Sequence, residues 1–390
     1  MKKPTVAVIF GSRSTEHDIS ILTALAAVIK PLQRSQKFQV VPVYIAKDGQ
    51  WYSGPKFEDI RFFQAKDFTE LLAKEKPIAV QLGKGLTLVA ATAFGTKKTA
   101  VDVVFPATHG THGEDGELMA LCELADVPYV GCDVESSVIA MDKVLAKQVA
   151  EAHGIATPKY HALAKDAYQA EPTTYLKKIN ADLQYPLFVK PAHLGSSIGI
   201  TRVTDKKELA NAIEVALHYD TKAVVEEAVN NLIEVTLPII GNEELTPAFV
   251  EEPLQHEDSF FDFDTKYMRG GKGKGQGGKV GSKGAQGYSN CPAQISDSLY
   301  EKAEAVGLQT YRALGCSGIA RVDMLIDKKT QKVYFNEVNP LPGSLYAHNW
   351  RKKGISNVEL VTRLVELARQ KHQQKQAMTT SFATSFLQQF

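Results

Sequence analysis

Residues 318–343 read GIARVDMLIDKKTQKVYFNEVNPLPG, two β-branched runs separated by a short polar segment. The runs cover residues 320–326 and 332–338, and the Asp-Lys-Lys-Thr segment between them is typical of a turn. Short β-branched runs joined by such a turn predict a β-hairpin. The Pro-Gly pair that ends the stretch predicts a further turn directly after the second strand.

Four polar side chains of this hairpin are expected to meet. Side chains at positions i and i+2 of a strand point to the same face, which places Arg321 beside Asp323 and Glu337 beside Asn339. Two carboxylates and an amide oxygen beside a guanidinium suit Mg²⁺ that also binds the phosphates of a nucleotide. Either carboxylate taken alone is better explained as a solvated surface charge. All four residues share one strand parity, however, and this favours a magnesium site.

Length and composition restrict the class of protein. A chain of 390 residues is expected to form two or three domains. The formal charge of +1 provides no overall field for a nucleic acid or a membrane, so neither is expected as a partner. Four cysteines without CxxC spacing are interpreted as reduced thiols. The first residues lack the pattern of a signal peptide, and no run of about 18 apolar residues occurs, so a cytoplasmic location is expected.

The N-terminal third predicts an α/β unit. The apolar run at residues 5–10 is typical of a buried parallel strand and precedes a periodic helix at about 19–29. Open α/β sheets bind ligands at the carboxyl ends of their strands, which makes Glu16 a candidate, although an acid favoured by the helix dipole explains it equally well. The buried strand at residues 101–106 ends in a glycine-rich loop with His109, typical of close backbone approach to a ligand.

Periodicity predicts the remaining elements. Strands are expected at residues 39–45, 86–90, 127–131, 186–190, 223–227 and 234–240. Helices are expected at residues 117–125, 136–153, 296–314 and 357–370, followed by a loosely ordered tail from residue 371. A zinc site at His109 and His112 is disfavoured, because no cysteine or third histidine lies near them in the sequence.

A second small-residue loop follows the strand that ends at Lys190. Residues 191–200 read PAHLGSSIGI, and such a loop can cover phosphates with its backbone N–H groups. A plain hairpin turn explains the Gly-Ser-Ser run slightly better, and the loop is neither a Walker A motif nor a dinucleotide fingerprint. Lys190 and Lys143 lie on separate elements and are candidates for binding the phosphates of one nucleotide.

Residues 270–287 contain nine glycines and four lysines. This composition predicts a flexible cationic loop, because it cannot bury enough apolar surface to order itself. An active-site lid is one interpretation, and a nucleic-acid-binding segment with salt-sensitive affinity is the other.

Eight motifs together resemble the D-alanine-D-alanine ligase family of ATP-grasp enzymes, in family order and over residues 6–368. They are FGSRSTEHDIS (10–20), HGTHGEDG (109–116), MDK (141–143), FVKPAHLGSSIGI (188–200), EEA (226–228), FFDFDTKY (260–267), ARVD (320–323) and NEVNPLPG (336–343). The resemblance implies an ATP-grasp fold of the α/β and α+β class with three domains and a tail. These are an N-terminal open parallel α/β sheet (1–135), a central α+β domain (136–230), a C-terminal α+β domain with the 270–287 lid (231–372), and a flexible tail (373–390).

The resemblance implies an activity as well. The enzyme would use ATP to convert one D-alanine into an acyl phosphate and join it to a second, releasing ADP and phosphate, for peptidoglycan precursor synthesis. Small-molecule substrates and a homodimer are expected. The implied ATP-binding residues are Lys143, Lys190, Ser196, Ser197, Ile198, Glu226, Glu227, Val229, Glu234 and Lys266. Among these, Glu226 would face the adenine amino group and Glu234 the ribose.

The remaining implied roles concern metal, substrates and chemistry. Asp323, Glu337 and Asn339 would hold two Mg²⁺ ions, with Mn²⁺ as a substitute. The implied catalytic residues are Glu16, Ser196, Tyr267, Arg321 and Gly343, and the implied substrate-binding residues are His109, Lys266, Ser344 and His348. Arg321 and the Gly343 N–H would stabilise the tetrahedral oxyanion, while Glu16 would bind the ammonium of the first substrate and His109 its carboxylate.

Two departures from the family pattern lie on the acceptor side. Pro340 stands where the family usually has threonine, and His348 stands where a serine is expected to bind the carboxylate of the second substrate. Ser344 is the nearby hydroxyl, and the lid is longer than expected. An alternative acceptor, namely another amino acid, D-lactate or a peptide, therefore stays open, although Tyr267 favours an amine.

Overall fold

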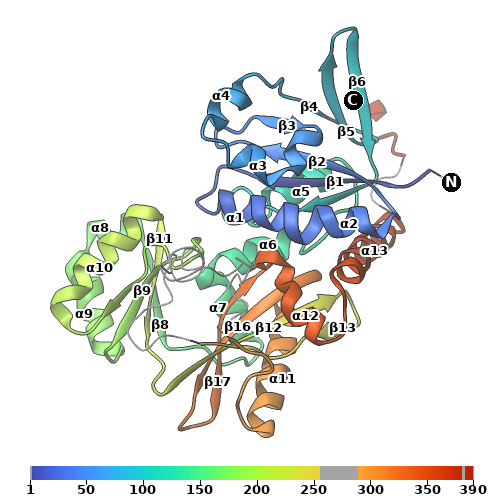
Figure 1. The fold of residues 1–390 in the computed structure, drawn as a ribbon. Helices are drawn as coiled ribbons and strands as arrows, with labels where there is room; N and C mark the ends of the chain where they lie inside the picture. Colours follow the sequence, from blue (N-terminus) through green and yellow to red (C-terminus); the bar gives the residue numbers. More distant parts are fainter. Residues whose placement is uncertain (1, 255–288, 380–382, 390) are drawn as a thin grey trace, which may run out of the picture.

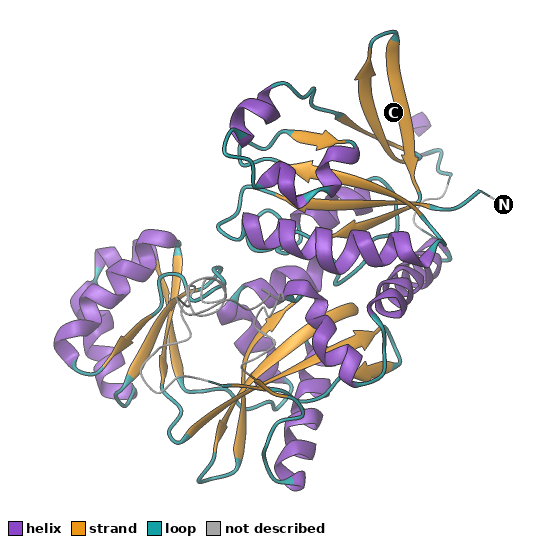
Figure 2. Cartoon of the chain, in the orientation of Figure 1, coloured by secondary structure: helices purple, strands orange, loops and turns teal. Residues whose placement is uncertain are grey.

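The computed structural model describes residues 2–254, 289–379 and 383–389 (Figure 1). The predicted lid at 270–287 lies outside the described residues, as do Lys266 and Tyr267 of the 260–267 motif. The described chain is mixed α/β, with three four-stranded sheets, one three-stranded sheet and one two-stranded sheet (Figure 2).

The first sheet has the strand order β3-β2-β1-β7. Its strands are β1 (Thr5–Gly11), β2 (Gln39–Ile45), β3 (Trp51–Ser53) and β7 (Val103–Pro106). β1 pairs in parallel with β2 and β7, and all seven of its residues are buried because helices cover the sheet. The predicted open parallel sheet is therefore confirmed, with β3 added antiparallel at one edge.

One long helical stretch follows β1, beginning two residues earlier and ending six residues later than predicted. It consists of α1 (His17–Leu22), a π-helical segment η1 (Thr23–Ile29) and α2 (Lys30–Ser35). π-Helical segments are uncommon and often occur at functional sites. The stretch lies along the first sheet (Figure 1) and brings the first residue of the π segment, Thr23, next to the loop that contains His109.

Two strand predictions in the N-terminal region need correction. The strand predicted at 101–106 is divided at Asp102, whose carboxylate accepts a hydrogen bond from the Thr5 N–H at 2.7 Å. The predicted strand at 127–131 is wrong, because Tyr129 makes only an isolated parallel bridge with Val104. The run is apolar enough for a strand but forms no ladder.

A three-stranded antiparallel sheet extends away from the first sheet (Figure 1). Its strands are β4 (Ala79–Gly83), β5 (Gly85–Thr92) and β6 (Gly95–Val101). The short helices of the same region are η2 (Pro55–Glu58), α3 (Ile60–Phe63), α4 (Phe68–Ala73) and α5 (Glu117–Leu124). β5 contains the strand predicted at 86–90, and α5 confirms the helix predicted at 117–125.

The helix predicted at 136–153 is two helices, α6 (Val134–Met141) and α7 (Lys143–Ala152). Asp142 separates them with extended backbone angles, and its side chain accepts hydrogen bonds from Val144 N and Leu145 N at 3.0 and 3.1 Å. An aspartate at such a position favours starting a new helix over continuing the old one. Lys143 is consequently the first residue of a helix and not an interior position.

The central sheet is antiparallel, with the order β10-β9-β11-β8. Its strands are β8 (Tyr160–Ala164), β9 (Leu187–Pro191), β10 (Thr201–Val203) and β11 (Lys222–Glu227), and its helices are α8 (Lys165–Ala170), α9 (Pro172–Asp182) and α10 (Lys206–Tyr219). The helices cover one face (Figure 2), where Leu209, Ile213 and Leu217 of α10 are buried against Val189 and Val225. The other face carries the polar side chains described below.

The C-terminal sheet has the order β13-β12-β16-β17. Its strands are β12 (Leu232–Gly241), β13 (Leu245–Pro247), β16 (Gly318–Asp327) and β17 (Lys332–Asn339), and β14 (Glu252–Pro253) pairs separately with β15 (Ser289–Asn290). β16 and β17 confirm the predicted hairpin. Their register opposes Arg321 to Asn339 and Asp323 to Glu337, with an irregularity directly after Asp323.

Five helical segments complete the described chain, namely α11 (Asp297–Ala313), η5 (Gly343–Tyr346), α12 (Ala347–Lys352), α13 (Asn357–Gln376) and η6 (Phe386–Gln389). α13 continues six residues beyond the predicted end, so the loosely ordered tail predicted from residue 371 is wrong for residues 371–376. Lys371 Nζ lies 2.8 Å from Asp133 Oδ2. Leu360 and Leu364 of α13 pack into the same core as Leu32 of α2.

This shared core joins the end of the chain to the N-terminal sheet, as Figure 1 shows for α13 and α2. The predicted domain boundaries at residues 135, 230 and 372 stay a prediction. Among the described residues, no helix combines the length and the apolar surface that crossing a membrane requires.

Candidate active site

The hairpin side chains meet, as the alternation of side chains along each strand predicted. Arg321 Nε and Nη2 donate to the two carboxylate oxygens of Asp323 at 2.6 and 2.5 Å, and Asn339 Nδ2 donates to Asp323 Oδ2 at 3.1 Å. Burial alone would lower the pKa of Arg321, but the Asp323 carboxylate outweighs burial and raises it well above its ordinary value. The guanidinium is therefore a permanent charge beside the carboxylate.

Asp323, Glu337 and Asn339 fit a hard divalent cation. They supply two carboxylates and one amide from adjacent strands, and such oxygen donors are the ligands that Mg²⁺ prefers. The NH₂ group of Asn339 faces Asp323, which leaves its carbonyl oxygen as the atom that suits a cation.

Lys143 connects this hairpin to two other segments. Its ammonium is buried, donates to the Leu194 carbonyl at 2.7 Å and lies 3.5 Å from Glu337 Oε2. The start of α7, the loop after β9 and strand β17 thus meet at one lysine. A predicted phosphate-binding residue and a predicted metal ligand are neighbours.

Glu226 lies between two lysines. Its carboxylate forms an ion pair with Lys190 and another with Lys147, whose Nζ lies 2.9 Å from Glu226 Oε2. Burial alone would raise the pKa of Glu226, but Lys147 and Lys190 outweigh burial and lower it to about 2. Lys190 Nζ also donates to Asn336 Oδ1 of β17 at 3.3 Å, so this cluster spans the central and C-terminal sheets.

Glu16 and Ser196, two of the implied catalytic residues, are in direct contact. Ser196 Oγ donates to Glu16 Oε1, and both side chains are buried although 180 residues separate them. A Cβ on Gly110 would collide with Ser14 Oγ and lie 3.0 Å from Glu16 Oε2, and one on Gly195 would lie 3.1 Å from Glu16 Oε2, so a larger residue at either position would crowd this carboxylate. The glycine loops therefore allow two backbone segments to enclose this carboxylate.

The loop around Ser196 has an unusual backbone. Ser196 and Ser197 have φ values of 53° and 59°, a left-handed conformation that non-glycine residues rarely adopt. Ile198 N donates to the Gly195 carbonyl at 3.2 Å, which closes a tight turn. Backbone strain of this kind often occurs at ligand-binding sites.

His109 contacts the segment that contains Ser344 through Thr23. The Thr23 hydroxyl lies 2.8 Å from His109 Nε2 and accepts a hydrogen bond from the Ser344 N–H at 3.0 Å. On its other side, His109 Nδ1 lies 3.8 Å from Glu114 Oε2, and burial raises the pKa of Glu114. Gly343 begins η5, directly before Ser344.

His348 faces Glu251. Its Nε2 lies 2.8 and 2.9 Å from the two carboxylate oxygens of Glu251, and its ring contacts Tyr346 at a centroid distance of 5.0 Å. The same tyrosine ring lies 5.0 Å from the Arg321 guanidinium carbon. Ser344, by contrast, has an exposed side chain. Through the Tyr346 ring, His348 belongs to a chain of contacts that reaches Arg321.

The remaining predicted nucleotide-binding residues do not all lie at this cluster. Glu234 on β12 is half-buried, and its negative charge contributes to raising the pKa of Lys190. Val229 is half-buried in the loop between β11 and β12. The Glu227 side chain is not brought to the cluster: it accepts a hydrogen bond from Gln184 N at 2.9 Å, because adjacent strand residues point to opposite faces.

Five residues of this region were not predicted from the sequence as site residues, namely Thr23, Lys147, His193, Glu251 and Tyr346. One of them carried a signal: Lys147 follows Lys143 by four residues, so both lie on one face of α7. The others are brought to the site by tertiary contacts alone.

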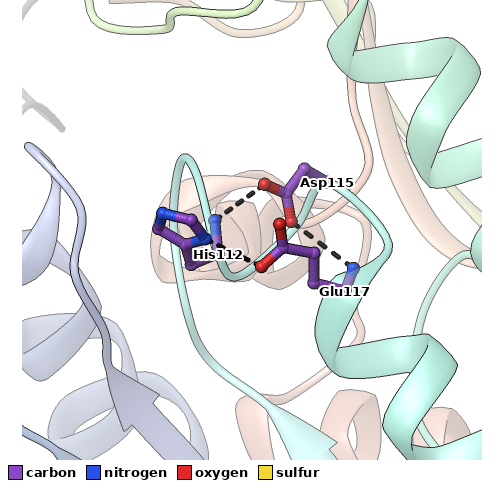
Figure 3. Close-up of side chains that lie close together, drawn as sticks. All are labelled: His112, Asp115 and Glu117. Atoms are coloured by element: carbon purple, nitrogen blue, oxygen red, sulfur yellow. Dashed lines mark hydrogen bonds and ion pairs between the residues drawn. The ribbon is translucent and has the colours of Figure 1, made fainter. Parts of the chain in front are cut away.

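Figure 3 shows a further group at the end of the glycine-rich loop and the start of α5, namely His112, Asp115 and Glu117, whose possible metal-binding atoms lie within 4.8 Å of one another. Asp115 already caps the backbone N–H groups of the other two, at 2.7 and 3.5 Å, and His112 Nδ1 lies 2.7 Å from Glu117 Oε2. All three ligand atoms thus have partners within the group. His109 instead contacts Thr23 and Glu114.

Comparison with known families agrees with this arrangement. The model of the D-ala D-ala ligase N-terminus matches residues 5–132, and the model of the D-ala D-ala ligase C-terminus matches residues 149–366. Among curated proteins, the D-alanine-D-alanine ligase of Chloroherpeton thalassium is 35% identical over 96% of this chain and 99% of the relative. That of Chlorobium phaeovibrioides is 36% identical over 94% and 98%.

Solved structures give the same result. The VanG D-Ala:D-Ser ligase from Enterococcus faecalis is 33% identical with a TM-score of 0.76, covering 94% of this chain and 100% of its own. The D-alanine-D-alanine ligase from Coxiella burnetii is 27% identical with a TM-score of 0.77, covering 96% and 97%. These matches confirm the expected ATP-grasp fold. The chain belongs to the D-alanine-D-alanine ligase family.

Proposed function

We infer that this chain is an ATP-dependent D-alanine-D-alanine ligase that supplies the dipeptide for peptidoglycan precursors, with release of ADP and phosphate. The observation that carries the inference is the contact between Lys143 and Glu337, at 3.5 Å. It joins an ammonium suited to nucleotide phosphates to a carboxylate suited to their metal ion. Curated relatives at 32–36% identity over nearly the whole chain support the same activity.

The nucleotide is proposed to lie between the central and C-terminal sheets. Lys143 and Lys190 bind its phosphates, and the backbone of Ser196, Ser197 and Ile198 covers them. Glu226 accepts a hydrogen bond from the adenine amino group, and Glu234 binds the ribose. Contacts that already span the two sheets, such as Lys190 with Asn336, support this assignment.

Asp323, Glu337 and Asn339 are proposed to hold two magnesium ions, which Mn²⁺ can replace. When bound, the ions neutralise charge on the phosphoryl group during its transfer. The residues of this chain contribute independently, because Arg321 orients Asp323 through two hydrogen bonds.

Glu16 and His109 are proposed to bind the first D-alanine by its ammonium and its carboxylate. Its reacting carboxylate is a poor acyl donor until it takes the γ-phosphoryl group of ATP. Glu16 is held by Ser196, which belongs to the loop proposed to cover the phosphates. Donor binding and phosphate covering are therefore linked through one hydrogen bond.

The amine of the second D-alanine then attacks the acyl phosphate, and negative charge develops on the former carbonyl oxygen. Arg321 and the Gly343 N–H are proposed to stabilise this oxyanion, and one fixed donor of this kind contributes about 3 kcal/mol. Ser344 and His348 are proposed to bind the second carboxylate. Lys266 and Tyr267, outside the described residues, are proposed to complete the site and to help exclude water, which would hydrolyse the acyl phosphate.

An acceptor other than D-alanine is not favoured, because the curated relatives at 32–36% identity are D-alanine-D-alanine ligases. D-serine deserves inclusion in the test, since the VanG structure is that of a D-Ala:D-Ser ligase. We further propose a cytoplasmic homodimer with roles in cell-wall formation and cell shape.

The test is ATP-dependent phosphate release with Mg²⁺, followed by mass determination of the product. D-Alanine alone should release phosphate and yield the dialanine mass, whereas L-alanine should give neither. Parallel reactions contain D-alanine with D-serine or with D-lactate. A mixed product in the absence of dialanine would contradict the proposed acceptor, and no phosphate release in any reaction would contradict the ligase.

A further inference from the structure

His193 bridges two buried carboxylates. Its Nδ1 lies 3.0 and 3.1 Å from the Asp220 carboxylate oxygens, and its Nε2 lies 3.3 Å from Asp142 Oδ2. The side chains of Asp142 and Asp220 are 8% and 6% exposed, against 40% for His193. A neutral imidazole has only one N–H and would present a bare nitrogen to one of the two carboxylates, so this geometry favours the imidazolium.

The two carboxylates belong to different parts of the fold. Asp142 caps the N-terminus of α7, directly before Lys143. Asp220 ends α10 and accepts a second hydrogen bond from the backbone N–H of His193, at 2.7 Å. His193 itself begins the loop that contains Ser196. One imidazole thus joins α7, the end of α10 and the glycine-rich loop.

The neighbours of His193 in the sequence both contact Lys143. The Lys143 backbone N–H donates to the Ala192 carbonyl at 3.0 Å, and the Lys143 ammonium donates to the Leu194 carbonyl at 2.7 Å. Movement of His193 relative to Asp142 would therefore move the loop relative to Lys143. The Ser196 loop and Lys143 are two of the groups proposed to bind the nucleotide phosphates.

We propose that His193, as an imidazolium held by Asp142 and Asp220, is a positioning residue that aligns Lys143 with the Ser196 loop for nucleotide binding. The proposal rests on the proposed function of this site as the phosphate-binding part of a ligase. His193 is not expected to touch the nucleotide. It acts through the two segments that it holds together.

The surrounding charges favour the imidazolium. The charged residues around His193 are Asp142, Asp220 and Lys222, and Lys222 forms an ion pair with Asp142. Hydrogen bonds to Asp142 and then Asp220 raise the pKa of His193 to about 9, against the lowering effect of burial. The contribution of His193 is fully present below its ordinary pKa of 6.5, persists at neutral pH, and is lost as the pH rises through about 9.

The experiment measures KM for ATP and kcat, at saturating D-alanine, between pH 7.5 and 10. About one tenth of His193 stays protonated at pH 10, so the wild-type KM for ATP should rise about tenfold above pH 8 while kcat changes little. His193→Arg keeps two donors and a permanent charge, and should retain a low KM without the alkaline rise. His193→Gln should have a raised KM at every pH.

A matched control is His161→Gln. His161 lies on β8 of the same sheet and pairs with an exposed carboxylate, Asp182, at 2.9 Å, so its replacement should leave KM and its pH profile unchanged. Asp220→Asn keeps the shape of the cluster and removes one charge. It serves as the second variant if His193→Gln fails to fold, and is expected to raise KM likewise.

Three results would overturn the proposal: a wild-type KM in both His193→Gln and Asp220→Asn, a loss confined to kcat, or the same alkaline rise in His193→Arg as in the wild type. Direct titration with ATP, without D-alanine, separates the proposal from the ligase assignment. If the wild type binds ATP but makes no dipeptide, the ligase assignment fails while the affinities of the His193 variants still decide the proposal. If the wild type does not bind ATP, both fail.

Discussion

Lys147 Nζ lies 2.9 Å from Glu226 Oε2, and the two side chains are 1% and 2% exposed. Lys190 pairs with the other oxygen of the same carboxylate. Removing one partner of a buried pair leaves the remaining charge uncompensated, which is far more costly than losing a surface pair. The carboxylate proposed to face the adenine therefore depends on a lysine that the sequence did not mark as functional.

Lys147→Met should lower the free energy of unfolding, but by less than the roughly 3 to 5 kcal/mol that an uncompensated buried charge costs, because Lys190 still pairs with Glu226. It should also weaken ATP binding, since Lys190 would be held more firmly by Glu226 and be less able to bind phosphate. Denaturant unfolding and ATP titration measure the two effects. Lys178→Met, on the exposed surface of α9, is the control, and equal stability of the two variants would contradict the structural role of Lys147.

Thr23→Val should reduce kcat/KM for D-alanine about ten- to a hundredfold. The substitution keeps the shape but removes the hydroxyl that faces both His109 and the Ser344 N–H, and buried groups left without a partner cost about 1 to 3 kcal/mol. Thr23→Ser restores the hydroxyl and should restore most of the activity. Steady-state kinetics with varied D-alanine decide this, and equal losses in the two variants would show that packing, not the hydroxyl, matters.

Tyr346→Leu should lower kcat about tenfold, because the aromatic ring over the Arg321 guanidinium would be lost, and such a contact contributes about 0.5 to 2 kcal/mol. Tyr346→Phe keeps the ring and should stay close to the wild type. The measurement is dipeptide formation at saturating substrates. A normal kcat in Tyr346→Leu would exclude this ring as a support for Arg321.

Glu337→Gln should abolish dipeptide formation and lower the melting temperature only modestly, because the side chain keeps its size but loses both the charge proposed to hold magnesium and the ion pair with Lys143. Glu359→Gln is the control, since Glu359 pairs on the surface with Arg363 and such pairs contribute little. Phosphate release over a range of Mg²⁺ concentrations measures the effect. Retained turnover in Glu337→Gln would contradict the metal assignment.

Much of the fold and of the site could be predicted locally. The β16–β17 hairpin, the parallel strand β1 and the common face of Arg321 and Asp323 follow from alternation and turn residues over a few positions. The motifs that carried the family resemblance are likewise continuous in the sequence. Errors occurred where a local pattern was ambiguous: the apolar run at 127–131 forms no strand, and Asp142 divides a predicted helix.

Most of the elements and the family follow from the sequence alone, because periodicity, caps and motifs act within short stretches of chain. Which distant groups meet depends on the packing of the whole fold. Ser196 reaches Glu16 across 180 residues, and Thr23 reaches Ser344 across 321. No periodicity encodes such contacts. They arise when buried polar groups must find partners in a packed interior, and the packing of whole sheets and helices selects those partners.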